Sequence, residues 1–300
     1  MEYHPLVSIA VITYNSAQYI IETLESAKGQ TYQNLELIIS DDCSIDNTVD
    51  LCKAWLSSNS DRFTRVKLLM SDTNTGISAN VNRVFRACDG EWIKPIAGDD
   101  ILLPYCVEAN LEFIDKHSSA RVIFSQCQNF ETVKGEKRII DTSPSEEYKY
   151  LFELDAEKQL VELYGICFPP ACNLFIHHEL HEKFSHDESI RNVDDYPYWI
   201  QITQQGYKLY YFDLTTVLYR VGESLSHSID KFYSTSFMDS IVKFWDSIMD
   251  MTMLYHPSVA RERKIQIKLY FFTKRVLRNR KNLLTKLVRK VAIKCYHAFL

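Results

Sequence analysis

Two adjacent carboxylates, Asp99 and Asp100, are the residues of this sequence best suited to chemistry. They follow Gly98 and an apolar run, residues 92–96, that is typical of a strand. Side-by-side acids disfavour a packed core, but their oxygens suit a hard divalent cation, which tolerates partial hydration. Gly98 leaves room for the phosphates of a ligand to approach the backbone. The competing interpretation is a solvated turn after an edge strand.

Three further polar clusters follow strand-like runs earlier in the chain. The runs cover residues 6–12, 35–40 and 66–70, and the clusters after them are Thr13-Tyr14-Asn15, Asp41-Asp42 and Asn74-Thr75-Gly76. Amphipathic helices are expected between them, at residues 17–27, 46–56 and 77–88, with Asn15 or Ser16 capping the first.

This alternation of strands and helices predicts a parallel sheet covered on both faces. Ligands of such folds bind at the carboxyl ends of the strands, where all four polar clusters fall. We therefore expect a nucleotide-type ligand there. The sequence lacks both the Gly-x-Gly-x-x-Gly turn and the phosphate-binding loop of P-loop proteins, so neither of those folds fits.

Composition indicates one large domain or a domain with an appendage, since the chain has 300 residues and 46% are hydrophobic. The 8 cysteines include no Cys-x-x-Cys pair. We see no signal peptide, and no apolar run approaches the roughly 20 residues of a membrane-spanning helix. The expected location is therefore the reducing cytoplasm, with peripheral attachment to the inner face of the cell membrane as an extension of that expectation.

The charge is distributed unevenly along the chain. Residues 261–300 contain 13 Lys or Arg and one acid, a balance of +12, whereas residues 1–260 contain 21 basic and 38 acidic residues, a balance of −17. Apolar residues recur among these bases, and basic amphipathic helices suit an anionic membrane surface. The alternative is a helical hairpin packed on the acidic body. Nothing else in the chain indicates a nucleic-acid partner.

The second half contains another acid pair, Asp194 and Asp195, at the start of a predicted helix. One of the two could simply cap that helix. Around it we expect a helix at residues 104–117 and a strand at 121–125. A hairpin with an exposed loop is expected at 129–150, followed by two closing strands at 207–212 and 216–220 and a helix from residue 231.

Taken in order, these motifs resemble the family-2 glycosyltransferases with the GT-A fold, over roughly residues 5–225. The segments that carry the resemblance are Val7-Ser8-Ile9, Thr13-Tyr14-Asn15, residues 40–48, Asn74-Thr75-Gly76-Ile77 and Gly98-Asp99-Asp100. The resemblance implies an α/β fold, with a mostly parallel, Rossmann-like central sheet flanked by helices. The helical spacing of apolar residues and the bases after residue 225 predict a C-terminal helical basic extension.

For the donor, the resemblance implies a nucleotide-diphosphate sugar, with UDP favoured. The turn at Thr13, Tyr14 and Asn15 and one of Asp41 and Asp42 would hold the base. Asn74 and Gly76 would complete the nucleotide site, Asp99 would face the ribose, and Asp100 would hold Mn²⁺ or Mg²⁺ on the diphosphate. This agrees with electrostatics, because carboxylates approach a diphosphate only through a bridging cation.

For the acceptor, the segment from Asn192 to Ile200 resembles the family's Glu-Asp-Tyr-x-x-Trp motif. Asp195 takes the position of the catalytic base, and Asp194 replaces the Glu. Transfer to a hydroxyl requires removal of a proton, which one positioned carboxylate can accomplish. A base without a protein nucleophile implies a single displacement with inversion at the anomeric carbon. Asp194 and Arg220 are further candidates for contacts with the diphosphate or the acceptor.

Three positions depart from the family pattern. Ala97 replaces the first acid of the family's Asp-x-Asp, Val81 replaces a basic residue, with Arg83 nearby, and Gly222 replaces a histidine. His227 is a candidate replacement for that histidine, and a surface-loop role is the competing interpretation.

The sequence therefore predicts an inverting glycosyltransferase of the hexosyltransferase type that acts in surface polysaccharide biosynthesis on a glycan or lipid-linked acceptor. The predicted domains are a glycosyltransferase domain, 1–225, with a nucleotide-sugar half, 1–103, and an acceptor half, 104–225, and a helical region with a basic tail, 226–300. Two alternatives remain: a nucleotidyltransferase on a related sheet, and a non-catalytic sugar-nucleotide-binding or membrane-docking protein.

Overall fold

A computed structural model describes residues 4–221, 233–279 and 287. Within these residues, a 9-stranded sheet has the order β3-β2-β1-β4-β8-β6-β9-β5, and β7 pairs with β6. The strands are β1 Val7–Thr13, β2 Leu35–Asp41, β3 Arg65–Met70, β4 Trp92–Ala97, β5 Ile101–Leu102, β6 Val122–Val133, β7 Glu136–Ser143, β8 Leu174–His177 and β9 Leu209–Arg220.

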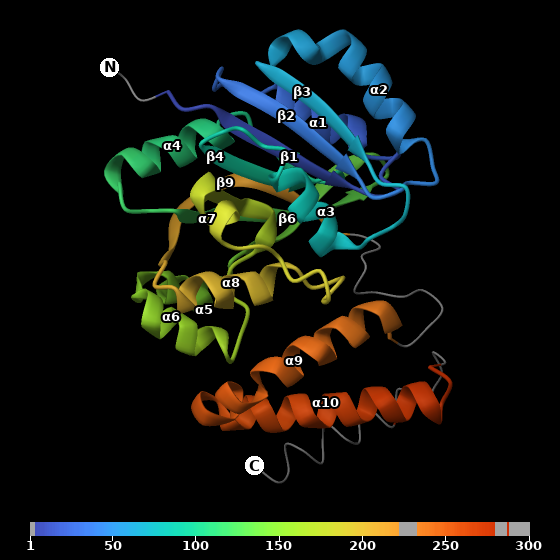
Figure 1. Cartoon of the computed structure of the whole chain (residues 1–300), viewed down its shortest axis with the longest axis vertical. Helices are drawn as coiled ribbons and strands as arrows, with labels where there is room; N and C mark the ends of the chain where they lie inside the picture. Colours follow the sequence, from blue (N-terminus) through green and yellow to red (C-terminus); the bar gives the residue numbers. More distant parts are fainter. Residues whose placement is uncertain (1–3, 222–232, 280–286, 288–300) are drawn as a thin grey trace.

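Helices cover both faces of this sheet (Figure 1). They are α1 Ile20–Lys28, α2 Thr48–Asn59, α3 Ile77–Phe85, α4 Cys106–Lys116, α5 Glu146–Lys149, α6 Ala156–Leu163, α7 His178–Lys183, α8 Asp195–Gln204, α9 Thr235–Tyr255 and α10 Pro257–Arg275. Short 3₁₀ turns lie at Ser60–Arg62, Tyr150–Glu153 and Ala171–Asn173.

The first four strands of the sequence form the parallel part of the sheet. β1 pairs in parallel with β2 and β4, and β2 pairs in parallel with β3. In β1, Val7, Ile9 and Val11 pack with α1, α2 and α4 on one face, whereas Ala10 packs on the opposite face with α3 and α8. Full burial of one such aliphatic side chain contributes roughly 1.5–3 kcal/mol. This two-sided burial explains the continuous apolar runs in the sequence.

The expected α/β class is confirmed. The β6–β7 hairpin overlaps the predicted range 129–150, but its first strand begins at Val122 and thus includes the strand predicted at 121–125. The two predicted closing strands are wrong as separate elements, because β9 runs without a break alongside β6 and absorbs two register shifts. The cap prediction for the first helix is also wrong. α1 begins at Ile20 rather than residue 17, and the Asn15 side chain instead accepts a hydrogen bond from the Ile45 N–H at 2.9 Å.

Beyond the sheet, α9 and α10 form a hairpin, and α8, α6 and α5 lie between this hairpin and the strands (Figure 1). The hairpin is held partly by Asp239, which accepts a hydrogen bond from the Tyr270 hydroxyl at 2.6 Å and pairs with Lys274 at 2.8 Å. The beginning of the basic tail is therefore folded back on α9. Gly222, His227 and most residues after Asn279 lie outside the described residues.

None of the described helices combines the length and apolar character of a bilayer-spanning segment. The seven cysteines within the described residues are all free thiols.

Candidate active site

The polar clusters that follow the parallel strands meet at one edge of the sheet. Thr13 lies opposite Asp41 in the β1–β2 register, and the next residue, Asp42, donates its N–H to the Thr13 carbonyl at 3.0 Å. Gly98, after β4, donates its N–H to the Ile12 carbonyl at 2.9 Å. A Cβ at Gly98 would lie 2.8 Å from the Thr13 hydroxyl, so glycine is needed for this close approach. The convergence expected from the sequence is therefore present.

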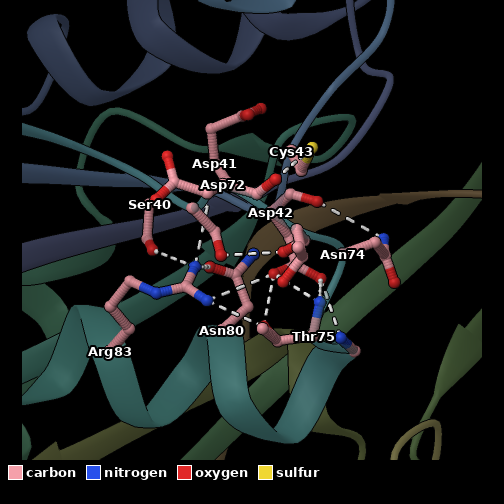
Figure 2. A network of polar contacts seen from close by, with 12 residues as sticks. Ser40, Asp41, Asp42, Cys43, Asp72, Asn74, Thr75, Asn80 and Arg83 are labelled. Carbon is pink, nitrogen blue, oxygen red and sulfur yellow. Dashed lines mark hydrogen bonds and ion pairs between the residues drawn. The ribbon is translucent and has the colours of Figure 1, made fainter.

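The hydrogen bonds of the Asp42 side chain are made to other residues of the protein, as Figure 2 shows. Its buried carboxylate accepts hydrogen bonds from the Thr75 N–H at 2.9 Å, the Gly76 N–H at 2.8 Å and the Thr75 hydroxyl at 2.5 Å. The Arg83 guanidinium adds an ion pair at 3.2 Å and reaches the Asn80 side chain at 3.0 Å. Asp42 thus fixes the loop before α3, and few acceptor positions remain for a ligand.

Asp41 is bonded less completely than its neighbour. Each of its carboxylate oxygens accepts one hydrogen bond from Ser44, from the N–H at 2.8 Å and from the hydroxyl at 2.5 Å. Ser44 in turn accepts the Asn15 N–H at 2.8 Å. The side chain of Tyr14, between Thr13 and Asn15, is 42% exposed. Of the two acids proposed for base recognition, Asp41 keeps the greater hydrogen-bonding capacity for a ligand.

The loop before α3 is joined to a distant segment of the chain. Gly76 has φ +94, and a Cβ there would lie 2.9 Å from the Arg191 carbonyl oxygen. That carbonyl accepts the Ile77 N–H at 2.9 Å, and the Arg191 guanidinium donates to the Asn74 side chain at 2.9 Å. Asn74 and Gly76 therefore hold the residues that lead into α8.

Asp100 contains an unpartnered buried oxygen. Its Oδ1 accepts the Arg220 N–H at 2.8 Å, whereas its buried Oδ2 has no hydrogen-bond partner among the described residues. Burial, reinforced by the charge of Asp99, raises the pKa of Asp100 well above the usual value for aspartate. Burial also raises the pKa of Asp99. A buried carboxylate oxygen without a donor is costly unless a cation or proton neutralises it.

The donor set around Asp100 limits what kind of cation site this edge can form. No group of three His, Cys, Asp or Glu side chains capable of enclosing a metal occurs in the described part of the chain. Mg²⁺ commonly binds through one or two carboxylates and takes its other ligands from phosphates and water. Asp100, with Asp99 beside it, fits that arrangement and does not fit a closed structural metal site.

Arg220 supports the acid pair from the end of β9. Its Nε donates to the Asp99 carbonyl at 2.9 Å, its Nη1 donates to the Thr132 hydroxyl at 2.7 Å, and its Nη2 pairs with Glu22. The guanidinium also lies 4.1 Å from the ring centroid of Tyr19. The side chain proposed as a diphosphate contact thus makes its described contacts within the protein, where it positions the turn that carries Asp99 and Asp100.

The second acid pair lies at the start of α8. Asp194 occupies the N-cap position, but within the described residues its side chain makes no capping hydrogen bond, and Asp195 accepts the Tyr196 N–H at 2.7 Å. Burial and the charge of Asp195 raise the pKa of Asp194 to about 7, and burial raises the pKa of Asp195. Adjacent carboxyl groups with raised pKa values are candidates for acid–base chemistry. The capping interpretation therefore does not account for Asp194.

The segment before α8 is joined to α3. In the described part of the chain, neither Asp194 nor Asp195 bonds to a residue of the sheet edge, and residues 186–191 connect the start of α8 to α3. Within that segment, the Ile190 carbonyl accepts the Ser78 hydroxyl at 2.7 Å, and the His186 N–H donates to Asn82 at 2.9 Å.

Sequence reasoning missed several supporting residues, namely Glu22, Ser44, Thr75, Lys94 and Arg191. Ser44 and Thr75 stand inside motifs that were singled out, so hydroxyl donors beside the predicted acids were a usable signal. Lys94 lies within an apolar strand, and nothing in the local sequence set it apart. Its fully buried ammonium donates to three carbonyl oxygens, and burial lowers its pKa. No local pattern indicated the pairing of Glu22 with Arg220, since β9 is far away in the sequence.

Comparison with known proteins places this site in a family context. The family model described as Glycosyl transferase family 2 matches residues 8–184. A putative glycosyltransferase, EpsE of Bacillus subtilis, is 34% identical over 119 residues, which cover 40% of this chain and 42% of that protein. The chondroitin synthase of Escherichia coli is 34% identical over 127 residues, covering 42% of this chain and 18% of that protein. The matched segments thus span less than half the length of either relative.

Solved structures with the same fold include two with bound nucleotide sugars. Staphylococcus aureus TarS 1–349 in complex with UDP-GlcNAc has a TM-score of 0.58 and 16% identity, covering 97% of this chain and 80% of that one. The mannosyltransferase PcManGT from Pyrobaculum calidifontis, in complex with GDP-Man and Mn²⁺, has a TM-score of 0.59 and 15% identity, covering 99% and 84%. At these identities the likeness establishes the GT-A fold. Since the family model covers more than half of the chain, this protein belongs to glycosyltransferase family 2.

Proposed function

We propose that this protein is an inverting glycosyltransferase that moves a sugar from a nucleotide-diphosphate donor to a hydroxyl group. The observation that carries the proposal is the buried Oδ2 of Asp100, which has no hydrogen-bond partner among the described residues, at the edge where Thr13, Asp41 and Gly98 converge. A divalent cation bound to a nucleotide diphosphate would supply the positive charge that neutralises the buried carboxylate of Asp100.

In the donor half, the Thr13-Tyr14-Asn15 turn and Asp41 are assigned to the base, with Asn74 and Gly76 completing the site. Asp42 supports them by fixing the loop before α3. Asp99 is assigned to the ribose and Asp100 to Mn²⁺ or Mg²⁺, which when bound would neutralise the charge of the diphosphate. The nucleotides named with TarS and PcManGT, UDP-GlcNAc and GDP-Man, support a nucleotide-sugar donor, and UDP is favoured.

In the acceptor half, Asp195 is assigned the role of general base. Its carboxylate takes the proton of the acceptor hydroxyl while the oxygen forms a bond to the anomeric carbon. The bond from that carbon to the phosphate oxygen breaks at the same time, and the nucleoside diphosphate leaves. A base with a raised pKa suits proton transfer near neutral pH, and burial raises the pKa of Asp195. One displacement from the opposite face inverts the anomeric configuration.

For the acceptor, we propose a glycan or a lipid-linked glycan of the cell surface. The support is the name of one relative, the chondroitin synthase of Escherichia coli. The biological placement rests on this analogy.

The exposed face of α10 is proposed to contact an anionic membrane surface. Arg261, Lys264 and Lys268 lie on one exposed face with Phe271 and Phe272, whose side chains are 42% and 44% exposed. Each such cation contributes about 1 kcal/mol near an anionic bilayer. The double substitution of Lys264 and Lys268 by Glu should therefore abolish co-sedimentation with phosphatidylglycerol vesicles. Equal co-sedimentation with phosphatidylcholine vesicles would argue against this contact.

The donor site is tested by thermal unfolding with a panel of UDP- and GDP-sugars, with and without Mn²⁺. We expect one donor to raise the melting temperature only when Mn²⁺ is present. Asp100→Asn should remove the Mn²⁺-dependent part of the increase, and Asp115→Asn, an exposed acid on α4, serves as the matched control. An equal Mn²⁺-dependent increase in Asp100→Asn would refute the metal assignment.

A further inference from the structure

The α9–α10 hairpin buries an arginine beneath the start of α8. Arg263 is only 5% exposed and shares its buried side of α10 with Ala260, Tyr270 and Thr273, although it belongs to the basic stretch of the chain. A guanidinium taken out of water is costly unless hydrogen bonds satisfy its donors. Its partners therefore indicate what this burial achieves.

Arg263 is bonded through both terminal nitrogens. Nη1 donates to the Tyr164 carbonyl at 3.0 Å and to the Thr252 hydroxyl at 2.9 Å. Nη2 donates to the Gly165 carbonyl at 2.9 Å and to the Tyr196 hydroxyl at 3.1 Å. The guanidinium thus joins α10 and α9 to the end of α6 and to the first turn of α8.

Tyr196 transmits this contact to the neighbouring carboxylate. Its hydroxyl donates to the Leu163 carbonyl at 2.5 Å while accepting from Arg263, and its ring packs edge-on against Phe244 of α9, with centroids 4.7 Å apart. With the ring and hydroxyl both held, the backbone of Tyr196 is held too. Its N–H is the group that donates to Asp195 Oδ1 at 2.7 Å.

The hairpin also holds the segment that precedes α8. The Asn192 side chain donates to the Ser236 hydroxyl at 2.5 Å, and Lys243 donates to the Ser189 carbonyl at 3.1 Å. The chain is therefore fastened to α9 before the Asp194–Asp195 pair and to α10 directly after it. This support comes from residues beyond the segment that the family model matches, 8–184.

We propose that Arg263 is a positioning residue for Asp195. It acts through Tyr196 and makes the α9–α10 hairpin part of the acceptor site. This inference rests on the proposed role of Asp195 as general base. A carboxylate that must accept a proton from a bound hydroxyl needs a fixed orientation, and a misplacement of about 1 Å can cost up to about 100-fold in rate.

The test uses the full chain in five variants, of which Asp195→Asn serves to test the base assignment itself. Tyr196→Phe removes one hydroxyl and keeps the ring, Arg263→Gln removes the guanidinium, and Arg263→Lys keeps a cation that can donate. Lys274→Met is the matched control, because it removes an ion pair between α10 and α9 without touching Tyr196. Two quantities are measured. The first is amide hydrogen exchange of residues 195, 196, 198 and 199, since Pro197 has no N–H. The second is release of UDP or GDP from UDP-GlcNAc, UDP-glucose and GDP-mannose with Mn²⁺.

We expect Tyr196→Phe and Arg263→Gln to exchange faster in the first turn of α8. Both should lower kcat by about 10- to 100-fold with the donor KM unchanged, because the donor half is untouched. Arg263→Lys should recover part of kcat, and Lys274→Met should behave like the native chain. If Arg263→Gln does not fold, Tyr196→Phe decides.

The inference is overturned if Tyr196→Phe leaves exchange in α8 unchanged, or if exchange rises while kcat stays at the native value. It also fails if Lys274→Met lowers kcat equally, since the hairpin would then act only through overall stability. Asp195→Asn distinguishes a failure of the general-base assignment from a failure of the positioning role. Retained turnover in that variant refutes the base assignment itself, whereas an inactive Asp195→Asn beside a fully active Tyr196→Phe refutes only the positioning role.

Discussion

Replacing Asp194 with asparagine should stabilise the protein at neutral pH and have little effect at acidic pH. Burial and the charge of Asp195 raise the pKa of Asp194 in the folded chain to about 7, against about 3.9 for an unperturbed aspartate. The folded state therefore holds this proton more tightly than the unfolded state. The contribution of this carboxyl group to stability is greatest below about pH 4, where both states are protonated, and falls as the pH rises towards 7. Asparagine cannot lose a proton, so the variant escapes this fall.

The size of the effect follows from the pKa difference. Roughly three units at about 1.4 kcal/mol each set a ceiling of about 4 kcal/mol. The two carboxyl groups titrate together, and Asp194 is partly exposed to water, so we expect about 1–2 kcal/mol. For a chain of 300 residues that corresponds to an increase in melting temperature of roughly 2–3 °C.

The assay is scanning calorimetry of the native chain and Asp194→Asn at a series of pH values from about 4 to about 8. The exposed Asp115→Asn serves as the control. We expect the difference in melting temperature to grow with pH and to vanish at the acidic end. A constant difference at every pH, or a destabilised variant at pH 8, would refute the claim that burial of the Asp194 carboxylate is costly.

Two other substitutions test how the sheet edge is built. Asp42→Ala leaves the Thr75 and Gly76 N–H groups without their acceptor, so urea denaturation should show a loss of about 3–5 kcal/mol; a loss below 1 kcal/mol would mean that the loop before α3 is held by other contacts. Gly76→Ala forces a Cβ to 2.9 Å from the Arg191 carbonyl at φ +94. It should cost about 1–3 kcal/mol and increase amide exchange at residues 186–191, whereas unchanged exchange there would show that α3 does not hold this segment.

Much of the parallel part of the sheet could be predicted from the sequence, because its signals are local. Apolar runs of strand length end directly in polar residues, and parallel strands must bring those ends to one edge. Thr13, Asp41 and Gly98 therefore meet where the pattern placed them.

The different hydrogen-bond partners of neighbouring residues could not be predicted in the same way. Asp41 and Asp42 are chemically identical in the sequence, and only the fold shows that Asp42 accepts the N–H groups of the loop before α3. Asn15 resembled a helix cap, yet its side chain bonds across to Ile45. Such choices depend on which backbone donors the tertiary structure brings near, and a linear pattern does not carry that information.

The C-terminal region gave the least reliable signal. Its bases suggested a solvated or membrane-facing surface, and many side chains of α10 are exposed on the surface of the protein. Arg263 is the exception, because it lies on the buried side with Ala260 and Tyr270. Helical spacing from Ala260 to Tyr270 could have indicated this position, since Arg263 stands where an apolar residue is expected. Its partners, Tyr164 and Tyr196, could be known only from the fold.

The most direct test of the account is nucleotide release by Asp195→Asn, measured with the donor that the thermal-unfolding panel identifies. We expect the rate to fall by at least about 100-fold. The Mn²⁺-dependent increase in melting temperature with that donor should stay at the native value, and Asp115→Asn should turn over like the native chain. Release by Asp195→Asn at the native rate would contradict the proposed mechanism at its centre.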